Sequence, residues 1–357
     1  MRLLIITQKV DVSDDNLGFF HGWIEKFAQK LDKVYVICLW QGEYSLPPNV
    51  VVRSLGKEKG SSKIGQFFRL QKHLIQTIPQ VDGIFVHMGS IYALASFPLA
   101  KIFRKKIVLW YAHVKPNISY IEKKIVSKIL TPSKESCSGS QKIVVTGHGV
   151  DTGLFKPKDN ANTTNRYPNA TNKEWRILYT GRITPIKDLE TLVEALNILI
   201  HQKSIKNIKV RIVGGPVDDS EKRYAAELKD FVKEKNLENC IEFVGGVPHQ
   251  ELVKFYQESD VFVNMIAKGG AGKTSLEAMA CGVPVVLCTP TFNELLGEYK
   301  NEIIFEEKNP HDFAEKLLNC LNFSEKKKKD FGRLLRSIVV NHHNLDNLID
   351  KIINSFK

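Results

Sequence analysis

Residues 261–286 read VFVNMIAKGGAGKTSLEAMACGVPVV, an apolar strand followed by a glycine-rich turn that opens a helix. The turn at 267–274, AKGGAGKT, is close to a phosphate-binding P-loop. A P-loop wraps backbone N–H groups around a phosphate, places a lysine on the γ-phosphate and a hydroxyl on magnesium, and Lys273 and Thr274 fit these two roles. Because glycine-rich turns at helix N-termini suit any diphosphate, the stretch predicts a nucleotide-binding strand–turn–helix unit.

Features around the turn argue against a P-loop nucleotidase. The first position of the motif is Ala267 rather than glycine, and only ~90 residues follow it, fewer than a typical domain. The helix would last about two turns before Cys281-Gly282 ends it. No apolar strand ending in aspartate follows that could hold magnesium. A nucleotidase that uses Lys273 and Thr274 therefore stays as an alternative only.

The composition is that of an ordinary globular protein, with 357 residues, 43% apolar and 25% charged. This length suits two domains. No apolar run approaches the ~20 residues of a membrane-spanning helix, and the first run, at 3–6, reads as a buried strand rather than a signal peptide. The six cysteines lack metal-ligand spacing, which fits a reducing compartment, so we expect a cytoplasmic protein.

The net charge of +12 lies wholly in the first half of the chain. Residues 1–170 contain 24 Lys and Arg against 12 Asp and Glu, whereas residues 171–357 contain 27 of each. One interpretation is a solvated surface. The other is a surface for anionic lipid head groups or a phosphorylated acceptor, which would place the protein on the inner face of the membrane. No recognisable nucleic-acid module accompanies the charge, so no nucleic-acid partner is expected.

Apolar strands alternate with amphipathic helices throughout, which predicts parallel α/β architecture. The expected strands are 3–6, 34–39, 84–86, 107–110, one near 129, 142–145, 177–179, 210–213, 241–244, 261–264 and 284–287. We predict a Rossmann-like domain at 1–155, a linker or surface loop at 156–174 and a second Rossmann-like domain at 175–335. A helical segment at 336–357 can pack back on the first domain. The lysine run 326–329 is expected to be an exposed helix face.

A second candidate phosphate site precedes the opening stretch. Tyr179-Thr180-Gly181-Arg182 closes a strand, and Lys187 follows on the turn that enters a helix. Two cations beside a helix N-terminus suit a pyrophosphate, although the pair taken alone also fits a solvated charged turn. Departure of a nucleotide diphosphate builds negative charge, so cations aimed at it act mainly on the transition state.

Several segments, taken together, resemble the retaining GT-B glycosyltransferases of glycosyltransferase family 4, also called glycosyl transferases group 1. They are GRITPIKDLETLVEA (181–195), IVGGP (212–216), FVGGVPHQELVKFYQESDVFV (243–263) and SLEAMACGVPVV (275–286), with VHM (86–88), LWYAH (109–113), LTPS (130–133) and GHGVDTGLF (147–155) in the first half. The match covers nearly the whole chain in the right order. It implies a GT-B fold of two Rossmann-like parallel-sheet domains facing a central cleft, and a hexosyltransferase-like enzyme.

The resemblance also implies roles for individual residues. Arg182 and Lys187 would neutralise the diphosphate of the leaving group, Glu277 would bind the ribose, and His113 would lie near the reacting sugar, so that His113, Arg182 and Lys187 form the catalytic set. The nucleotide would further be bordered by Gly18, Gly214 and Val247. The donor-sugar loop would comprise Gly269, Gly270, Ala271, Gly272, Lys273 and Thr274.

The implied donor is a UDP- or GDP-sugar, which is a co-substrate, so no cofactor is expected. The acceptor would be a saccharide or a lipid-linked saccharide of the cell envelope that meets the basic first domain. The resemblance also implies retention at the anomeric carbon. No Asp-x-Asp occurs in the chain, and no metal is needed if Arg182 and Lys187 replace it.

The chain departs from the family at Gly269, where the family usually carries a glutamate eight residues before the position of Glu277. Because that carboxylate normally holds sugar hydroxyls, a non-catalytic sugar-nucleotide binding protein is a further alternative, and Lys273 is a candidate substitute contact. Structural alternatives also stay open. Thr274-x-x-Glu277 fits a helix capping box, His113 can be a core histidine, and the Gly-Gly pairs at 214–215 and 245–246 can be tight turns. We expect His87 to serve packing.

Overall fold

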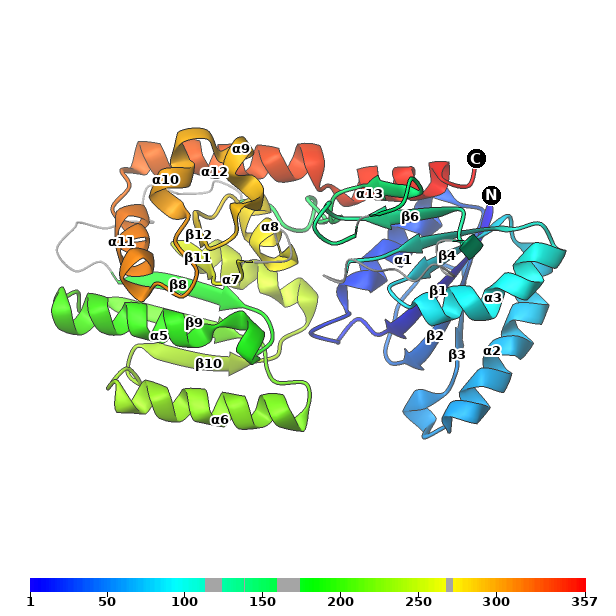
Figure 1. The fold of residues 1–357 in the computed structure, drawn as a ribbon, viewed down its shortest axis with the longest axis horizontal. Coiled ribbons are helices and arrows are strands. Elements are labelled where there is room, and N and C mark those ends of the chain that lie inside the picture. The colour runs from blue at the N-terminus through cyan, green and yellow to red at the C-terminus, as the bar shows by residue number, and fades with distance from the viewer. Residues whose placement is uncertain (113–123, 138, 159–173, 268–271) are drawn as a thin grey trace. The chain divides into compact units, whose positions relative to one another are not determined.

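The computed structural model describes residues 1–112, 124–137, 139–158, 174–267 and 272–357. These residues divide into two compact units. Unit 1 comprises Met1–Asp151 with His342–Lys357, and unit 2 comprises Thr152–Asn341. Each unit is built around one sheet in which every pair of neighbouring strands is parallel (Figure 1). The prediction of two Rossmann-like parallel-sheet domains is therefore confirmed.

The sheet of unit 1 has seven strands in the order β3-β2-β1-β4-β5-β6-β7. Its strands are β1 (Arg2–Val10), β2 (Lys33–Gln41), β3 (Val50–Ser54), β4 (Gly83–His87), β5 (Lys106–Trp110), β6 (Lys128–Thr131) and β7 (Ile143–Val145). Its helices are α1 (Phe19–Lys30), α2 (Lys63–Thr77), α3 (Ser90–Ile102) and α13 (Leu345–Asn354). The order changes direction between β1 and β4, as in doubly wound folds.

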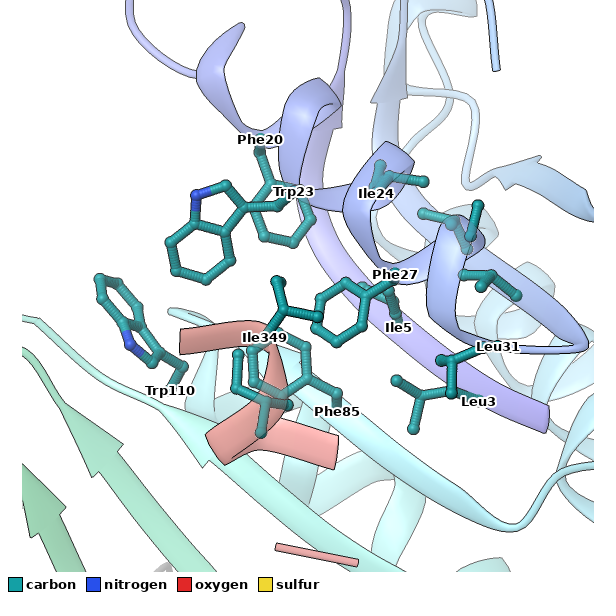
Figure 2. Packing of buried hydrophobic residues seen from close by; sticks show 14 of the residues in the cluster. Leu3, Ile5, Phe20, Trp23, Ile24, Phe27, Leu31, Phe85, Trp110 and Ile349 are labelled. Carbon is teal, nitrogen blue, oxygen red and sulfur yellow. The ribbon is translucent and has the colours of Figure 1, made fainter. Parts of the chain in front are cut away.

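Both faces of this sheet are buried, because alternate residues of each strand point to opposite sides. Leu3 and Ile5 of β1 pack with α1 and α13, whereas Leu4 and Ile6 pack with α2 and α3. Figure 2 shows the first cluster, in which aromatic side chains of α1 lie beside strand residues and Ile349 of α13. The C-terminal helix thus completes the core of unit 1.

The sheet of unit 2 has five strands in the order β10-β9-β8-β11-β12. They are β8 (Trp175–Thr180), β9 (Ile208–Val213), β10 (Ile241–Gly245), β11 (Val261–Asn264) and β12 (Val285–Leu287). The α-helices are α5 (Leu189–Asn197), α6 (Asp219–Glu234), α7 (Leu252–Glu258), α8 (Lys273–Ala280), α9 (Asn293–Leu296), α10 (Lys300–Ile303), α11 (Pro310–Leu321) and α12 (Glu325–His342). Short 3-10 turns at Pro185–Lys187 (η4) and His249–Glu251 (η6) precede α5 and α7.

The unit boundaries differ slightly from those predicted at 155 and 335. Arg336 explains the difference, because its guanidinium donates to the carbonyl oxygens of Thr152 and Phe155 and of Ala280. This residue therefore binds within unit 2, and the crossing into unit 1 comes later, after Asn341. Most of the predicted linker, 159–173, lies outside the described residues.

The helical segment predicted at 336–357 consists of two helices, because α12 ends at His342 and Asn344 caps α13 by accepting from the backbone N–H of Asp346. The prediction for the lysine run needs correction. Lys328, in the lysine run expected to be exposed, is only 8% exposed and lies 4.7 Å from the ring centroid of Trp175. Within the described ranges, every helix is too short or too polar to span a bilayer.

Candidate functional site

The strand order of unit 2 places its candidate site at the ends of β8 and β11. These neighbouring strands lie where the order changes direction, and open parallel sheets bind ligands in the crevice outside the carboxyl ends of such strands. The turn after β8 carries Arg182 and Lys187, and the turn after β11 leads into α8, which carries Lys273 and Glu277. The topology thus places the predicted phosphate and ribose residues on the two strand–helix connections that flank one switch point.

Glycines allow the turns at this edge of the sheet to approach each other closely. Gly214 has a φ of +125°, and a Cβ built on it would lie 2.1 Å from the carbonyl oxygen of Gly181. The backbone N–H of Gly181 donates to Val213, and that of Gly214 donates to Gly245. The turn that carries Arg182 is therefore fixed against the ends of β9 and β10 by backbone contacts, which only glycine permits at position 214.

Arg182 lies on the surface of the β8 turn, with its side chain 45% exposed. Its Nη1 lies 3.2 Å from Oε1 of Glu221, which is buried near the start of α6 and also accepts from the backbone N–H of Val217. One ion pair thus orients the guanidinium, and five N–H donors leave it further bonding capacity. Such a group can bind a phosphate.

Lys187 ends η4, just before helix α5. Burial, together with the nearby positive charge of Arg182, lowers the pKa of Lys187 to about 8. Its ammonium forms no ion pair with any other residue in the described ranges. A half-buried cation that lacks an anionic partner is suited to an anionic ligand, which would offset the repulsion from Arg182.

Glu277 of α8 is 1% exposed and held by three side chains. His249 Nε2 lies 2.7 Å from its Oε1, the Tyr256 hydroxyl donates to its Oε2 at 3.1 Å, and Lys273 Nζ lies 3.7 Å from Oε1. Burial alone would raise the pKa of Glu277, but these partners, His249 first, hold the pKa below its ordinary value. The carboxylate is therefore ionised and fixed.

A buried tyrosine joins the two sides of the site. The Tyr256 hydroxyl lies 2.8 Å from Oγ1 of Thr180, the last residue of β8, and it also bonds Glu277 of α8. The last residue of β8 and the Glu277 carboxylate are thus connected through one hydroxyl. Neither Tyr256 nor His249 was predicted to hold Glu277. The only signal was their presence in the segment 243–263.

The capping-box interpretation of Glu277 is wrong. No side chain caps α8, whose N-cap is Gly272 with a φ of +62°, and the Glu277 carboxylate binds His249 and Tyr256 instead. Burial lowers the pKa of Lys273 to about 7, although the Glu277 carboxylate acts to raise it. Thr274 follows in the first turn of α8 and is half-buried.

The structure does not favour the P-loop alternative. Helix α8 contains only eight residues, as predicted from Gly282, and just one strand, β12, follows it at the edge of the sheet. Lys273, the lysine that would reach a γ-phosphate, lies beside Glu277. In the described part of the chain, no group of three or more His, Cys, Asp or Glu side chains could hold a metal ion.

Some predicted site residues cannot be placed together with these. His113, Gly269, Gly270 and Ala271 lie outside the described residues. Val247 is half-buried in the segment between β10 and η6, two residues before His249.

Two predictions concern unit 1. Gly18 is the N-cap of α1, and a Cβ there would lie 2.3 Å from the carbonyl oxygen of Asp14, so the loop after β1 requires a glycine. His87, at the end of β4, is 1% exposed and stacks on Phe20 with ring centroids 4.0 Å apart. Its predicted packing role is confirmed.

Part of the chain matches a known protein family. Residues 161–333 match the family model described as Glycosyl transferases group 1. The chain is 30% identical to the D-inositol 3-phosphate glycosyltransferase of Kineococcus radiotolerans over 147 residues. This aligned stretch covers 41% of this chain and 34% of that protein. Over 111 residues it is 29% identical to the mannosylfructose-phosphate synthase of Agrobacterium fabrum, covering 31% and 24% of the two chains. The chain thus spans only about a third or less of these two relatives.

Solved structures extend the likeness of fold to the whole chain. Anabaena HepE, solved in complex with UDP and glucose, superposes with a TM-score of 0.76 at 17% identity over 99% of both chains. The sucrose-phosphate synthase of Thermosynechococcus elongatus superposes with a TM-score of 0.76 at 17% identity, over 99% of this chain and 98% of that one. The expected GT-B fold is confirmed, and residues 161–333, about half of the chain, match the glycosyl transferases group 1 family.

Proposed function

We propose that the protein transfers a sugar from a nucleotide diphosphate sugar bound at the carboxyl ends of β8 and β11. The observation that carries this proposal is the pairing of two cations, Arg182 and Lys187, with a buried ionised carboxylate, Glu277, across one switch point. A nucleotide diphosphate presents anionic oxygens and ribose hydroxyls, which need cationic donors and an acceptor respectively.

In this proposal Arg182 and Lys187 bind the diphosphate and stabilise the charge that develops as it leaves. Both lie on the turn between β8 and α5, where helix N–H groups also favour an anion. Because the leaving group gains negative charge in the transition state, these donors lower the barrier more than they strengthen ground-state binding. They supply the charge that a divalent metal would otherwise provide, so we propose transfer without a metal.

Glu277 is proposed to accept hydrogen bonds from the ribose hydroxyls. Each carboxylate oxygen offers about two lone-pair sites, so the bonds to His249 and Tyr256 leave acceptor capacity. His249 and Tyr256 are proposed as positioning residues, which hold the carboxylate in one geometry and keep it ionised. Lys273 is proposed to contact the phosphate or the sugar in place of the carboxylate that the family carries at the position of Gly269.

We propose UDP rather than GDP as the nucleotide. The support is that the structural relative HepE was solved with UDP, with UDP and glucose and with UDP-glucose, and another relative with UDP-2-fluoro glucose. Retention at the anomeric carbon and a saccharide or lipid-linked acceptor follow from the family resemblance. The net positive charge of residues 1–170 supports an acceptor on an anionic surface, with the protein in the cytoplasm and peripheral to the membrane.

A nucleotide screen tests the donor site. We expect UDP to raise the melting temperature in the presence of a chelator, GDP to raise it less, and Glu277→Gln to abolish the effect. Magnesium-dependent ATP hydrolysis that Lys273→Ala eliminates would instead establish a P-loop nucleotidase and overturn the proposal. Turnover is tested with UDP-sugars and saccharide acceptors, and the anomeric configuration of the product is assigned by NMR.

A non-catalytic binding protein is the second candidate, and the glycine at position 269 favours it. It predicts that UDP-sugars bind at the same site but are never transferred or hydrolysed. Incubation of the protein with each UDP-sugar, followed by measurement of released UDP, separates the two functions. Release of UDP that Arg182→Ala strongly reduces would establish the enzyme, because the variant removes a phosphate contact and not the fold.

A further inference from the structure

Helix α2 exposes a row of large apolar side chains on its outer face. Ile64, Phe68 and Ile75 are 71%, 67% and 59% exposed, and their spacing of four and seven residues places them on one side of the helix. The opposite side, through Leu70 and Leu74, packs into the core. The apolar outer face therefore has no role in stabilising unit 1.

The neighbouring helix α3 also exposes large apolar side chains. Ile91 and Ile102 are 69% and 71% exposed, and their spacing of eleven residues again places them on one side. Helices α2 and α3 contact each other on the same face of the sheet (Figure 1). We call the exposed faces of the two helices the α2–α3 surface. Apolar side chains that recur along one face, rather than singly, are typical of an interaction site.

The segment that contains this surface is predominantly basic. Residues 59–106 contain eight Lys and Arg but only one acidic residue, Asp82, whose carboxylate accepts from the backbone N–H of Arg2. Helix α2 contains Lys63 and Lys72, both exposed, and neither forms an ion pair with a residue in the described ranges. Exposed apolar groups next to unpaired cations match the boundary between acyl chains and anionic head groups.

We propose that the α2–α3 surface binds an anionic lipid bilayer. The phenyl and alkyl groups of α2 and α3 enter the head-group boundary, and Lys63 and Lys72 contact the anionic head groups. A second copy of the chain is a poorer occupant, because a two-fold dimer through this surface would place its basic groups against the same basic groups. The proposal is independent of the donor site, because lipid binding needs no nucleotide.

Sedimentation with vesicles tests the proposal on the full chain. We expect binding to phosphatidylcholine vesicles that contain phosphatidylglycerol, little binding to pure phosphatidylcholine, and weaker binding as salt rises. Lys63→Gln and Lys72→Gln should each lower the partition coefficient about fivefold, and Phe68→Ser should lower it about tenfold or more. Matched controls in unit 2 are Lys203→Gln, Lys206→Gln and Leu295→Ser, which change exposed residues and should leave binding unchanged.

Three outcomes would overturn the proposal. The first is no binding to anionic vesicles, and the second is binding that the α2 variants and the unit 2 controls weaken equally. The third is a concentration-dependent dimer, seen by light scattering, that Phe68→Ser dissociates while vesicle binding is absent. Thermal unfolding of each variant serves as the check on folding, and because these side chains are exposed we expect unchanged melting temperatures. Loss of vesicle binding with intact UDP binding would leave the donor site unaffected.

Discussion

The imidazole Nε2 of His249 lies 2.7 Å from Oε1 of Glu277, although 28 residues separate them in the sequence. The contact joins η6, which follows β10, to helix α8, which follows β11. Since the Glu277 side chain is 1% exposed, water cannot replace this partner freely. His249 is therefore a main determinant of both the charge and the position of the carboxylate proposed to bind ribose.

Replacement of His249 should destabilise the protein. We expect His249→Ala to lower the free energy of unfolding by about 2–3 kcal/mol in urea titrations, because it leaves a buried carboxylate with one donor fewer. His249→Gln, which restores a donor, should recover part of the loss. The matched control is His201→Ala, since His201 is exposed and, among the residues that the structure describes, bonds only the Lys235 carbonyl oxygen. Equal costs for the two alanine variants would contradict this role.

The same variant should change the response to acid. The pKa of Glu277 lies below 4.5 in the folded protein, so its contribution to stability is complete above about 4.5 and is lost as the pH falls through the folded value. Without His249, burial dominates and the pKa rises, so the loss begins at higher pH. Urea midpoints measured from neutral pH downward should begin to fall at a higher pH in His249→Ala than in the unmodified protein. Midpoints that fall over the same pH range in both proteins would refute the prediction.

Removal of the Arg182 guanidinium should slow the reaction. We expect Arg182→Ala to lower kcat by two to three orders of magnitude, a loss of about 3–4 kcal/mol of transition-state stabilisation, as for other anion-stabilising donors. Arg211→Ala is the control, because Arg211 is 42% exposed, close to the 45% of Arg182, and is likewise paired with carboxylates, Glu242 at 3.3 Å and Glu258 at 2.9 Å. Similar kcat values for the two variants would exclude a phosphate role for Arg182.

Donor affinity should depend on the protonation of Lys187. Its pKa is about 8 in the free protein, and a bound diphosphate favours the charged form, so binding above this pH requires proton uptake. UDP-sugar affinity should therefore be constant below about pH 8 and fall by up to tenfold per pH unit above it. Lys187→Arg stays charged and should retain affinity without this fall. Calorimetric titrations from about pH 7 to about pH 9 measure the difference. If the UDP-sugar affinity of Lys187→Arg still falls with pH in this range, a group other than Lys187 takes up the proton.

The sequence was sufficient to predict most of the strands. Buried parallel strands read as continuous apolar runs, so the predicted 177–179 and 210–213 fall within β8 and β9. Strand β3 was missed because it lies at the edge of its sheet and is half-buried along its whole length. Lys328 was misread because its partner Trp175 is distant in the sequence.

The partners of Glu277 could not be predicted for a related reason. Motif spacing indicated a turn after β8 and a turn after β11, and both lie at the switch point. The bonds from His249 and Tyr256 depend on how η6 and α7 pack over the ends of the strands, which no local pattern encodes. The same limit applies to Gly214, where the sequence allowed a tight turn but did not reveal its approach to Gly181.

The hydroxyl of Tyr256 should couple stability to donor binding. Tyr256→Phe leaves the Thr180 hydroxyl and Oε2 of Glu277 each with one partner fewer, so we expect a loss of about 1–3 kcal/mol in unfolding free energy and weaker UDP binding. The control is Tyr224→Phe, which removes a hydroxyl bonded to Glu190 at 2.6 Å. That variant should lose stability but keep UDP affinity. UDP affinity that is unchanged in Tyr256→Phe would argue against a positioning role.

Gly214 and Gly245 provide a matched test of the turn that carries Arg182. Both have positive φ, but a Cβ on Gly214 would lie 2.1 Å from the Gly181 carbonyl oxygen, whereas a Cβ on Gly245 would meet nothing within 4 Å. Gly245→Ala should therefore cost only the backbone term of about 1–2 kcal/mol. Gly214→Ala adds overpacking, for a total of about 2–5 kcal/mol, and it must displace the turn beside Arg182. We expect UDP titrations to show weaker binding in Gly214→Ala alone. If the two variants match in unfolding free energy and affinity, close approach at Gly214 does not position the turn that carries Arg182.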